Sequence, residues 1–261
     1  MISVIVPALN EEEQIEATLR SLINQSLEIE SYEIIVVDGG SDDGTVEIAL
    51  EYADRVIFQT HPGIGGARRD GAEAAQGRIL AFTDADTAFA RGWLEVLSRN
   101  LERHDASTGP VIFQDRDLRT EILQAWRSSY KLLKAFNFCY MIGSNMAMRR
   151  ETYQRAGGHR DISLLDDYDL SVKLFKIGAD AVYDPRQAVY TSSRRAHKLL
   201  TYGVTVAYGH YNYAVTKDYD KLLNYPKVDD MTVKDVLNGI RWGRNVVSAV
   251  ETVQSTLKRE Q

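Results

Sequence analysis

Nearly continuous hydrophobic runs occur through the first 85 residues, and each run stops at a polar or turn-forming residue. Runs of this length and composition are typical of strands that are buried on both faces of a sheet. Four of them predict strands, at Ile2–Val6, Ile34–Val37, Val56–Phe58 and Ile79–Thr83.

The segments between these strands place apolar residues at helical spacing. Three helices are expected: residues 11–25 with Ile15, Leu19, Leu22 and Ile23 on one face, Asp42–Ala53 with Val46, Ala49 and Leu50 facing in, and Ala67–Ala75 after a glycine-rich turn at Gly63–Gly66. Strands that alternate with helices in this way predict an α/β fold, with a mostly parallel central sheet flanked by helices on both faces.

The alternation weakens after residue 90. Further elements are expected as helices at Arg91–Leu101, Leu118–Phe136 and Leu165–Lys176, and as strands at Val111–Phe113 and Ala181–Asp184. Residues 196–216 and Thr232–Leu257 predict a helical tail, in which Thr232 and Asp235 resemble a capping box. We therefore expect one α/β domain over residues 1–195 and a helical C-terminal extension over residues 196–261.

Composition narrows the class of protein. The 261 residues are 44% hydrophobic and 26% charged, which are ordinary globular values. The single cysteine, Cys139, excludes a disulfide framework and a zinc site built on cysteines. No signal peptide is apparent, and no apolar stretch approaches the roughly 20 residues that span a bilayer, so we expect a cytoplasmic protein.

Charge is distributed unevenly along the chain. Of the net charge of −6, residues 1–195 contribute −8 and residues 196–261 contribute +2. The negative charge of residues 1–195 argues against nucleic-acid binding.

The C-terminal extension, residues 196–261, holds six of the fourteen tyrosines, and tyrosine suits surfaces that are half apolar and half wet. One hypothesis is a peripheral contact with a membrane surface; the alternatives are a helical cap over the active site and a contact in a homodimer.

Candidate functional residues lie at the carboxyl ends of the predicted strands, where α/β sheets bind ligands. One crevice there is able to collect Pro7–Glu11, Asp38 and Asp84–Asp86. On a continuing strand, Asp84 and Asp86 would face the same side and share a hard divalent cation that also binds a diphosphate. The alternative is a solvated Asp-rich turn.

A second acidic cluster, Asp166-Asp167-Tyr168-Asp169, opens a predicted helix. Acidic residues stabilise a helix start, but one would suffice for that purpose. A like-charge pair near a substrate raises one pKa toward a value that is useful for a general base. Both interpretations stay open at this point.

Three further features have a plain structural alternative. The glycines of Gly63–Gly71 let backbone N–H groups approach an anion, with Arg68 as an added cation, or else form a tight turn. Asp38 is placed to accept hydrogen bonds from a base or ribose, or simply ends a strand. Arg194 and Arg195 suit a phosphate clamp or a solvated basic loop. The five histidines, at positions 61, 104, 159, 197 and 210, show no metal-ligand spacing and are interpreted as structural or surface residues.

Together these segments resemble the inverting family 2 glycosyltransferases, which have a GT-A fold. The resemblance covers about residues 1–195. It is carried by Ser3–Glu12 (first strand and nucleotide-binding turn), Glu33–Thr45 (second signature), Gly66–Gly71 (Ala-Arg segment), Ala81–Asp86 (D-x-D motif), Gly143–Arg150 (acceptor-side segment) and Asp166–Leu170, which stands where the family often has Glu-Asp-x-Asp-Leu.

The resemblance implies metal-dependent transfer of a sugar from a nucleotide-diphosphate sugar to an acceptor hydroxyl, with inversion at the anomeric carbon. It implies that Asp167 is the catalytic base and that Asp86, with Asp84, holds Mg²⁺ or Mn²⁺, while Arg68 stabilises the leaving diphosphate. The implied donor site contains Pro7, Ala8, Asn10, Glu11, Asp38, Arg68, Asp84 and Asp86. Asp166, Arg194 and Arg195 are candidates for contacts to the acceptor or a phosphate, and the acceptor is expected to be a glycan or a lipid-linked molecule.

The sequence also departs from the family pattern. Gly39 replaces a second Asp, Asp166 replaces the usual Glu, and Arg69 stands where Asn is frequent. The Gln-x-x-Arg-Trp motif of processive synthases is absent, which favours non-processive transfer of a single sugar. Two other functions are kept as alternatives: a sugar nucleotidyltransferase on a similar sheet, and a non-catalytic protein that binds nucleotide sugars.

Overall fold

The computed structural model describes residues 1–115, 117–129, 133, 138–193 and 199–225. The chain divides into two compact units. The larger unit contains Met1–Asp161 and Asp166–His197, and the smaller contains Ile162–Leu165 and Lys198–Gln261.

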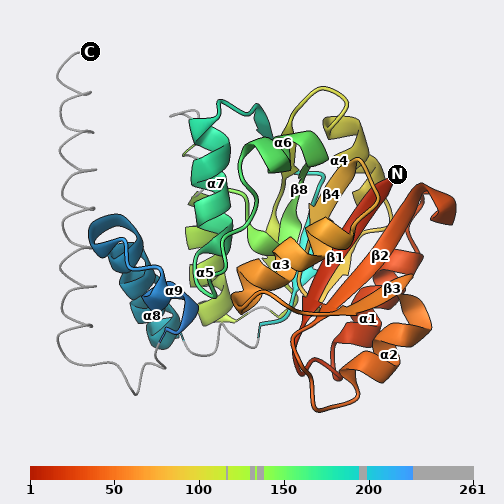
Figure 1. Ribbon diagram of the computed structural model, residues 1–261, viewed down its shortest axis with the longest axis horizontal. Coiled ribbons are helices and arrows are strands. Elements are labelled where there is room, and N and C mark those ends of the chain that lie inside the picture. The colour runs from red at the N-terminus through yellow and green to blue at the C-terminus, as the bar shows by residue number, and fades with distance from the viewer. Residues whose placement is uncertain (116, 130–132, 134–137, 194–198, 226–261) are drawn as a thin grey trace. The chain divides into compact units, whose positions relative to one another are not determined.

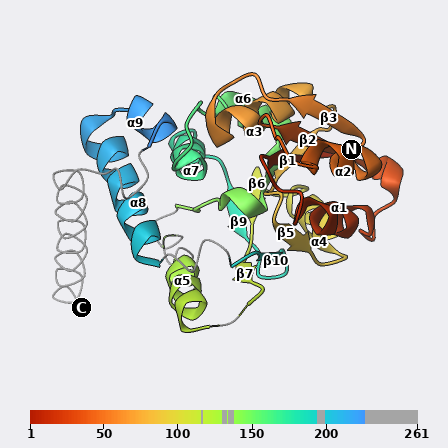
Figure 2. The same cartoon turned by 90° about the horizontal axis from the view of Figure 1, so that it is seen from below.

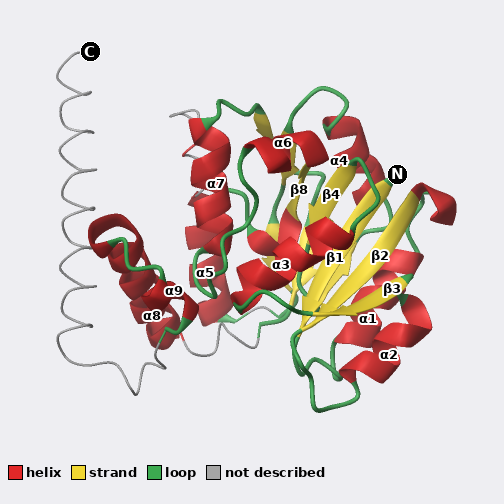
Figure 3. Cartoon of the chain, in the orientation of Figure 1, coloured by secondary structure: helices red, strands yellow, loops and turns green. Residues whose placement is uncertain are grey.

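Two sheets form the larger unit. The strands of the main sheet are, in spatial order, β3 (Arg55–Phe58), β2 (Tyr32–Asp38), β1 (Ile2–Ala8), β4 (Ile79–Phe82), β8 (Met146–Arg149), β6 (Ala106–Thr108) and β9 (Ala181–Tyr183). Figure 3 labels the strands from β3 to β8. From β3 to β4 all neighbours are parallel, whereas β8 is antiparallel to both β4 and β6. The second sheet has the order β5 (Thr87–Phe89), β10 (Val189–Thr191) and β7 (Val111–Phe113).

Helices cover both faces of the main sheet (Figure 1). On one face, α1 (Ile15–Ile23), α2 (Thr45–Tyr52) and α4 (Trp93–Asn100) bury a cluster that includes Leu19 and Trp93. On the other face, α3 (Gly63–Ala74), α6 (Arg150–Arg155) and α7 (Asp166–Lys176) bury a second cluster that includes Ile5 and Leu170. Figure 2 shows α3 on one side of β1 and both α1 and α4 on the other. The predicted α/β fold is therefore confirmed.

The glycine-rich segment differs from its prediction. Gly63–Gly66, expected as a turn, form the first turn of α3. The side chain of Asp70 in α3 accepts hydrogen bonds from the backbone N–H groups of Thr60 and His61. These bonds tie the preceding loop to the helix, and this tertiary restraint allows the helix to begin at residues of poor helix propensity.

Helix faces and short strands show where local patterns fail. Leu50, expected to face in, has 65% of its surface exposed, because α2 packs through Ala49 and the partly buried Ile48. Ile23 is 38% exposed at the end of α1.

The hydrophobic pattern does not predict some of the short strands, which are the three-residue strands β5, β6 and β10 and the four-residue strand β8. Helix α5 (Leu118–Ser129) lies within the range predicted as Leu118–Phe136.

The smaller unit contains α8 (Leu199–Tyr211), a π-helical turn (Asn212–Thr216) and α9 (Asp220–Leu223). The backbone N–H of Ser163 donates to the carbonyl of Leu222, which joins the segment Ile162–Leu165 to α9. Among the predicted tail tyrosines, Tyr208 is buried. The predicted helix Thr232–Leu257 lies outside the described residues.

Within the residues that the structure covers, no helix is both long and apolar enough to cross a membrane. The peripheral membrane contact and the homodimer stay predictions.

Candidate active site

The ends of β1 and β2 form one side of the candidate site. Ala8 and Asp38 are partners in the parallel register of these strands, and Asp38 is 1% exposed. Its carboxylate accepts hydrogen bonds from the backbone N–H of Gly40 at 3.0 Å and of Ser41 at 3.2 Å. Gly40 has a φ of 92°, a conformation that favours glycine. The carboxylate of Asp38 is therefore oriented by the turn that follows its own strand.

Hydrogen bonds join the loop after β1 to the loop after β2. The side-chain oxygen of Asn10 accepts from the backbone N–H of Asp42 at 3.0 Å, and the backbone N–H of Asn10 donates to the hydroxyl of Ser41 at 3.0 Å. The N–H of Glu11 donates to Thr45 Oγ1 at 2.8 Å. Asn10 and Glu11 therefore lie in this linked pair of loops, and α1 begins only at residue 15.

Arg68 of α3 lies at the centre of a second group of residues. The residue is 2% exposed, and its guanidinium bridges two carboxylates: Nη2 binds Asp84 Oδ1 at 2.6 Å and Nη1 binds Asp166 Oδ2. Burial lowers the pKa of Arg68, but Asp166, Asp84 and Asp167 outweigh this effect and hold the pKa above its ordinary value. Arg68 is thus a fixed positive charge. We call Arg68, Asp84, Asp166 and Asp167 the Arg68 cluster.

The two carboxylates at the start of α7 have different partners. Asp166 is buried against Arg68, whereas Asp167 accepts hydrogen bonds from Tyr140 Oη at 3.2 Å and from the N–H of Gly143 at 3.1 Å. Burial raises the pKa of Asp166 to about 6, against the opposing effect of Arg68, and the charge of Asp167 adds to the increase. Burial also raises the pKa of Asp167, with Arg68 and the hydrogen bonds acting in the opposite direction.

Asp169 explains why this helix start carries a third acidic residue. Its side chain is 1% exposed and its Oδ2 lies 2.7 Å from Lys173 Nζ. The ammonium of Lys173 in turn donates to the carbonyl of Gly158 at 2.8 Å. Asp169 therefore helps to hold the loop after α6, whereas Asp166 and Asp167 belong to the Arg68 cluster.

Asp84 and Asp86 do not continue a strand. β4 ends at Phe82, and Asp86 lies in a turn that leads into β5. Asp84 binds Arg68, while Oδ1 of Asp86 lies 3.4 Å from the hydroxyl of Thr191 in β10. Both carboxylates are partly exposed. The register interpretation of the D-x-D segment is thus wrong, although both residues follow the carboxyl end of a central strand.

Gly143 stands out in the sequence only as part of a motif, and the structure gives it a contact with Arg68. A Cβ atom at this position would lie 2.8 Å from Nη2 of Arg68 and 2.9 Å from Nη1. Two ion pairs fix that guanidinium, so a larger residue at 143 would displace it. Tyr140, which contacts Asp167, had no signal in the sequence.

A row of aromatic rings begins at Tyr140, which contacts Asp167. The ring of Tyr168 lies 5.9 Å from that of Tyr140 and 6.2 Å from that of Phe138, and Phe138 lies 5.8 Å from Phe175. A pocket adjoins this group; its lining includes Val111, Gln124, Phe138, Tyr140, Ile142 and Tyr183. Arg194 and Arg195 lie outside the described residues.

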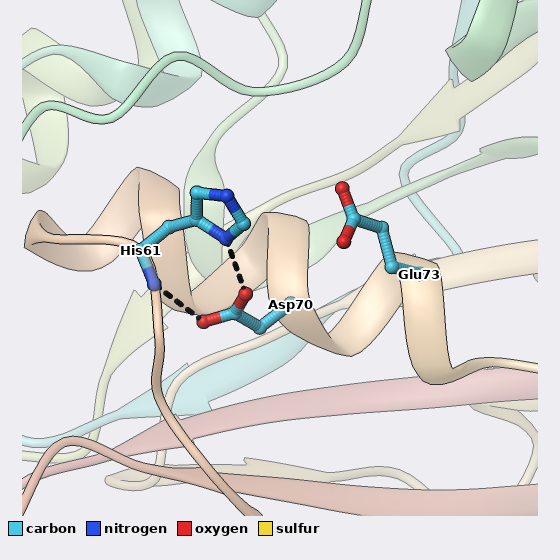
Figure 4. A group of neighbouring side chains, drawn as sticks. All are labelled: His61, Asp70 and Glu73. Carbon is cyan, nitrogen blue, oxygen red and sulfur yellow. Dashed lines mark hydrogen bonds and ion pairs between the residues drawn. The ribbon is translucent and has the colours of Figure 1, made fainter.

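A third group, His61, Asp70 and Glu73, resembles a metal site because its ligand atoms lie within 4.8 Å of one another (Figure 4). However, His61 Nδ1 is 2.5 Å from Asp70 Oδ1, shorter than the spacing of about 2.9 Å that two ligands at right angles on one metal would have. Burial raises the pKa of Asp70, but hydrogen bonds from His61 and Thr60 lower it to about 2. The group therefore braces the loop before α3.

Known proteins with related sequences include several that are named as glycosyltransferases. The family model described as "Glycosyl transferase family 2" matches residues 3–157. Among curated proteins, glycosyltransferase AglE of Haloferax volcanii is 39% identical over 100 residues, which are 36% of this chain and 33% of that protein. Probable glycosyltransferase YdaM of Bacillus subtilis is 28% identical over 197 residues, which are 68% of this chain and 47% of that protein. The chain thus spans half or less of the length of these relatives.

Solved structures share the fold. A mannosyltransferase of Pyrobaculum calidifontis in complex with GDP-Man and Mn²⁺ superimposes with a TM-score of 0.66 at 20% identity, over 98% of this chain and 79% of that one. S. aureus TarS 1–349 in complex with UDP-GlcNAc gives a TM-score of 0.65 at 18% identity, over 92% and 79% of the two chains. At these identities the likeness shows the fold alone.

Proposed function

The chain belongs to glycosyl transferase family 2, and we propose that it transfers one sugar from a nucleotide-diphosphate sugar to an acceptor hydroxyl, with inversion at the anomeric carbon. The observation that carries the proposal is the Arg68 cluster. A buried cation bridges a carboxylate after β4 to a carboxylate at the start of α7, next to Asp167. The cluster thus combines charge for a leaving group with a candidate base.

The donor nucleoside is assigned to the ends of β1 and β2. Pro7, Ala8, Asn10, Glu11 and Asp38 lie there, and both loops are fixed by hydrogen bonds to each other. Preformed polar groups at the carboxyl ends of parallel strands suit a nucleotide. Structural neighbours in complex with GDP-Man and with UDP-GlcNAc support a nucleotide-sugar donor.

The residues after β4 fit a divalent cation. Asp84 and Asp86 are partly exposed carboxylates that stand two positions apart, and Mg²⁺ and Mn²⁺ prefer such oxygen ligands together with the phosphates of a substrate. We assign the metal to Asp86 with Asp84. When bound, the ion would neutralise the negative charge that grows on the departing diphosphate.

Arg68 adds a second positive charge for the same diphosphate. The guanidinium is charged, buried and held by two ion pairs, so little reorganisation is needed when negative charge develops nearby. Fixed charges of this kind often make the greatest single contribution to lowering a reaction barrier.

Asp167 takes the proton of the acceptor hydroxyl in this mechanism. Its carboxylate is oriented by Tyr140 and Gly143, and burial brings its pKa closer to neutrality, where a general base is effective. The rings of Tyr140 and Tyr168 provide an apolar face for a glycan or a lipid-linked acceptor. Inversion then requires only this base and one displacement.

Product analysis separates this proposal from the two alternatives. The purified protein is incubated with UDP- and GDP-sugars and Mn²⁺, with and without acceptors, and in a parallel reaction with UTP or GTP and a sugar 1-phosphate. Release of nucleoside diphosphate supports transfer, release of pyrophosphate indicates a nucleotidyltransferase, and binding without turnover indicates a non-catalytic protein.

The metal assignment is tested by calorimetry. Asp86→Ala should abolish the Mn²⁺-dependent part of the affinity for the nucleoside diphosphate, because the cation loses one of its two protein carboxylates. An Mn²⁺-dependent affinity equal to that of the unsubstituted protein would contradict the assignment.

A further inference from the structure

His159 is a buried titratable residue that the proposed mechanism leaves unused. Its side chain has no exposed surface, and its Nε2 lies 3.9 Å from Oδ2 of Asp166. Among the residues that the structure describes, this nitrogen has no hydrogen-bond partner. A buried ring nitrogen without a partner is costly, so its position next to the Arg68 cluster calls for a physical reason.

The loop that carries His159 is fixed on several sides. The N–H of Gly158 donates to the carbonyl of Tyr153 at 3.0 Å, and the N–H of His159 donates to Tyr153 Oη at 3.0 Å. Lys173 holds the carbonyl of Gly158. The imidazole also meets the ring of Phe82 edge to face at 4.8 Å. The direction of Nε2 is therefore set by the fold.

The contacts of Tyr153 favour one tautomer of the imidazole. Since the hydroxyl oxygen accepts the backbone N–H of His159, its proton is available for Nδ1 of that ring, 3.1 Å away. Nδ1 is then the acceptor, and the proton of the neutral ring lies on Nε2, which faces Asp166. Burial, with the charges of Arg68 and Lys173, lowers the pKa of His159 well below 6.5, which keeps the ring neutral.

Asp166 needs a second hydrogen-bond donor if Arg68, its first one, is shared with another anion. Arg68 Nη1 binds the same Oδ2 that faces His159, and under the proposed function Arg68 also attracts the diphosphate of the donor. A buried carboxylate is costly unless it is paired and hydrogen-bonded, so a second donor compensates when its cation is shared with another anion. The gap of 3.9 Å is about 1 Å longer than a hydrogen bond, and hydrogen bonds in ligand-free active sites often tighten when the ligand binds.

We propose that His159 is a positioning residue whose Nε2–H holds the carboxylate of Asp166 when Arg68 engages the donor diphosphate, with Tyr153 fixing the tautomer. This inference rests on the proposed function. It assigns to His159 a role in the donor-bound state, in addition to packing in the free protein.

The tautomer is tested by nitrogen NMR of the whole protein labelled at histidine. The signals of His159 are identified by their loss in His159→Gln. A neutral ring protonated at Nε2 is expected. A ring protonated at Nδ1, or at both nitrogens, overturns the proposal whether or not the protein is a transferase.

The positioning role is tested by titration with UDP and with GDP in the presence of Mn²⁺. His159→Phe keeps a ring against Phe82 but has no donor, whereas the side-chain amide of His159→Gln offers an N–H at about the place of Nε2. The Phe variant should bind nucleotide about tenfold more weakly, and the Gln variant should recover to within about threefold. His104→Phe, which alters an exposed His–Asp pair, is the matched control.

The outcomes distinguish this inference from the proposed function. Equal affinities of the Phe and Gln variants overturn the positioning role, provided that their thermal midpoints match that of the unsubstituted protein. In the background of Asp166→Asn, the His159→Phe effect should shrink below about twofold, and an undiminished effect overturns the role as well. If neither nucleotide binds the unsubstituted protein, the proposed function fails and the role of His159 fails with it.

Discussion

Asp38 is the last residue of β2 and Asp84 follows β4, the two strands that flank β1, yet the two carboxylates are held in opposite ways. Asp38 is oriented by N–H groups two and three residues further along its own turn. Asp84 is held by Arg68, 16 residues away in sequence, which also binds Asp166, 98 residues away. The turn fixes its carboxylate with neutral backbone dipoles. The Arg68 cluster is a balance of full charges, which a charged ligand is able to redistribute.

This comparison predicts different sensitivities for the two regions. Removal of Arg68 leaves the carboxylates that it binds without their cation, so stability should change strongly, and removal of Asp167 should change turnover strongly. A change in the turn removes one hydrogen bond among several, so the effect should be small and confined to donor binding.

The largest effect is expected for Arg68→Met. Because Asp166 would lose its buried cation and Asp84 its ion pair, the free energy of unfolding should fall by about 3–5 kcal/mol. Urea unfolding followed by circular dichroism measures this change.

The neighbouring residue provides the control for this experiment. Arg69 is 41% exposed and pairs with Glu73 at the surface, so Arg69→Met should change the free energy of unfolding by less than about 1 kcal/mol. An equal loss in the free energy of unfolding in the two variants would mean that the Arg68 cluster contributes no more to stability than a surface ion pair does.

Asp167→Asn should affect turnover and leave donor binding intact. The amide keeps the shape of the side chain but cannot take a proton, so kcat should fall by at least about a hundredfold. Stopped assays of sugar transfer give kcat, and calorimetry gives the affinity for the nucleotide.

Asp180→Asn is a suitable control for that substitution, because the Asp180 side chain is 66% exposed and lies in a surface pair with His104. Normal turnover in Asp167→Asn would refute the assignment of the base. A loss of turnover that came with a loss of nucleotide affinity would instead point to a general disturbance of the site.

The two regions also differ in how far the sequence predicts them. The strands β1, β2 and β4 follow from hydrophobic runs, and the candidate residues at their ends follow from the rule that ligands meet the carboxyl ends of parallel strands. The turn after Asp38 is local, and Gly40 and Ser41 stand beside it in the sequence. Such features depend on a few consecutive residues, so periodicity and turn chemistry are sufficient.

The partners within the Arg68 cluster did not follow from the sequence. Arg68 was a candidate for contacts to a diphosphate, but its choice of Asp84 and Asp166 depends on α3 and α7 packing on the same face of the sheet. The start of α3 depends on Asp70, which lies within the helix and holds the loop before it. These contacts arise from tertiary packing, which local patterns do not contain.

The fall of activity at low pH, the acid limb of the pH profile, should reflect the like-charge pair of Asp166 and Asp167 in the Arg68 cluster. Burial raises the pKa of Asp166 to about 6 and raises that of Asp167, so the pair keeps a proton at a pH where an ordinary Asp has lost it. A base that holds a proton cannot accept another, and kcat/KM for the donor should therefore begin to fall at a higher pH than an ordinary Asp would give, by about tenfold per pH unit.

Asp166→Asn checks the origin of this limb. The substitution removes the negative charge next to Asp167, so the limb should move to lower pH. A limb near pH 4 in the unsubstituted protein, or no movement in the variant, would contradict the coupling of the two carboxyls.

The smallest effect is expected for Asp38→Asn. The new side chain retains one acceptor oxygen for the turn, and its amide group loses the hydrogen bond that the second oxygen makes with a backbone N–H of Gly40 or Ser41. One such bond is worth about 1 kcal/mol, so the donor KM should rise about fivefold while kcat stays within about twofold. Steady-state kinetics at saturating acceptor give both constants, and Asp42→Asn, at an exposed position of the same loop, should change neither. A fall in kcat as large as that of Asp167→Asn would mean that the turn contributes to the chemical step, and the distinction between a neutral binding region and a charged reacting region would be lost.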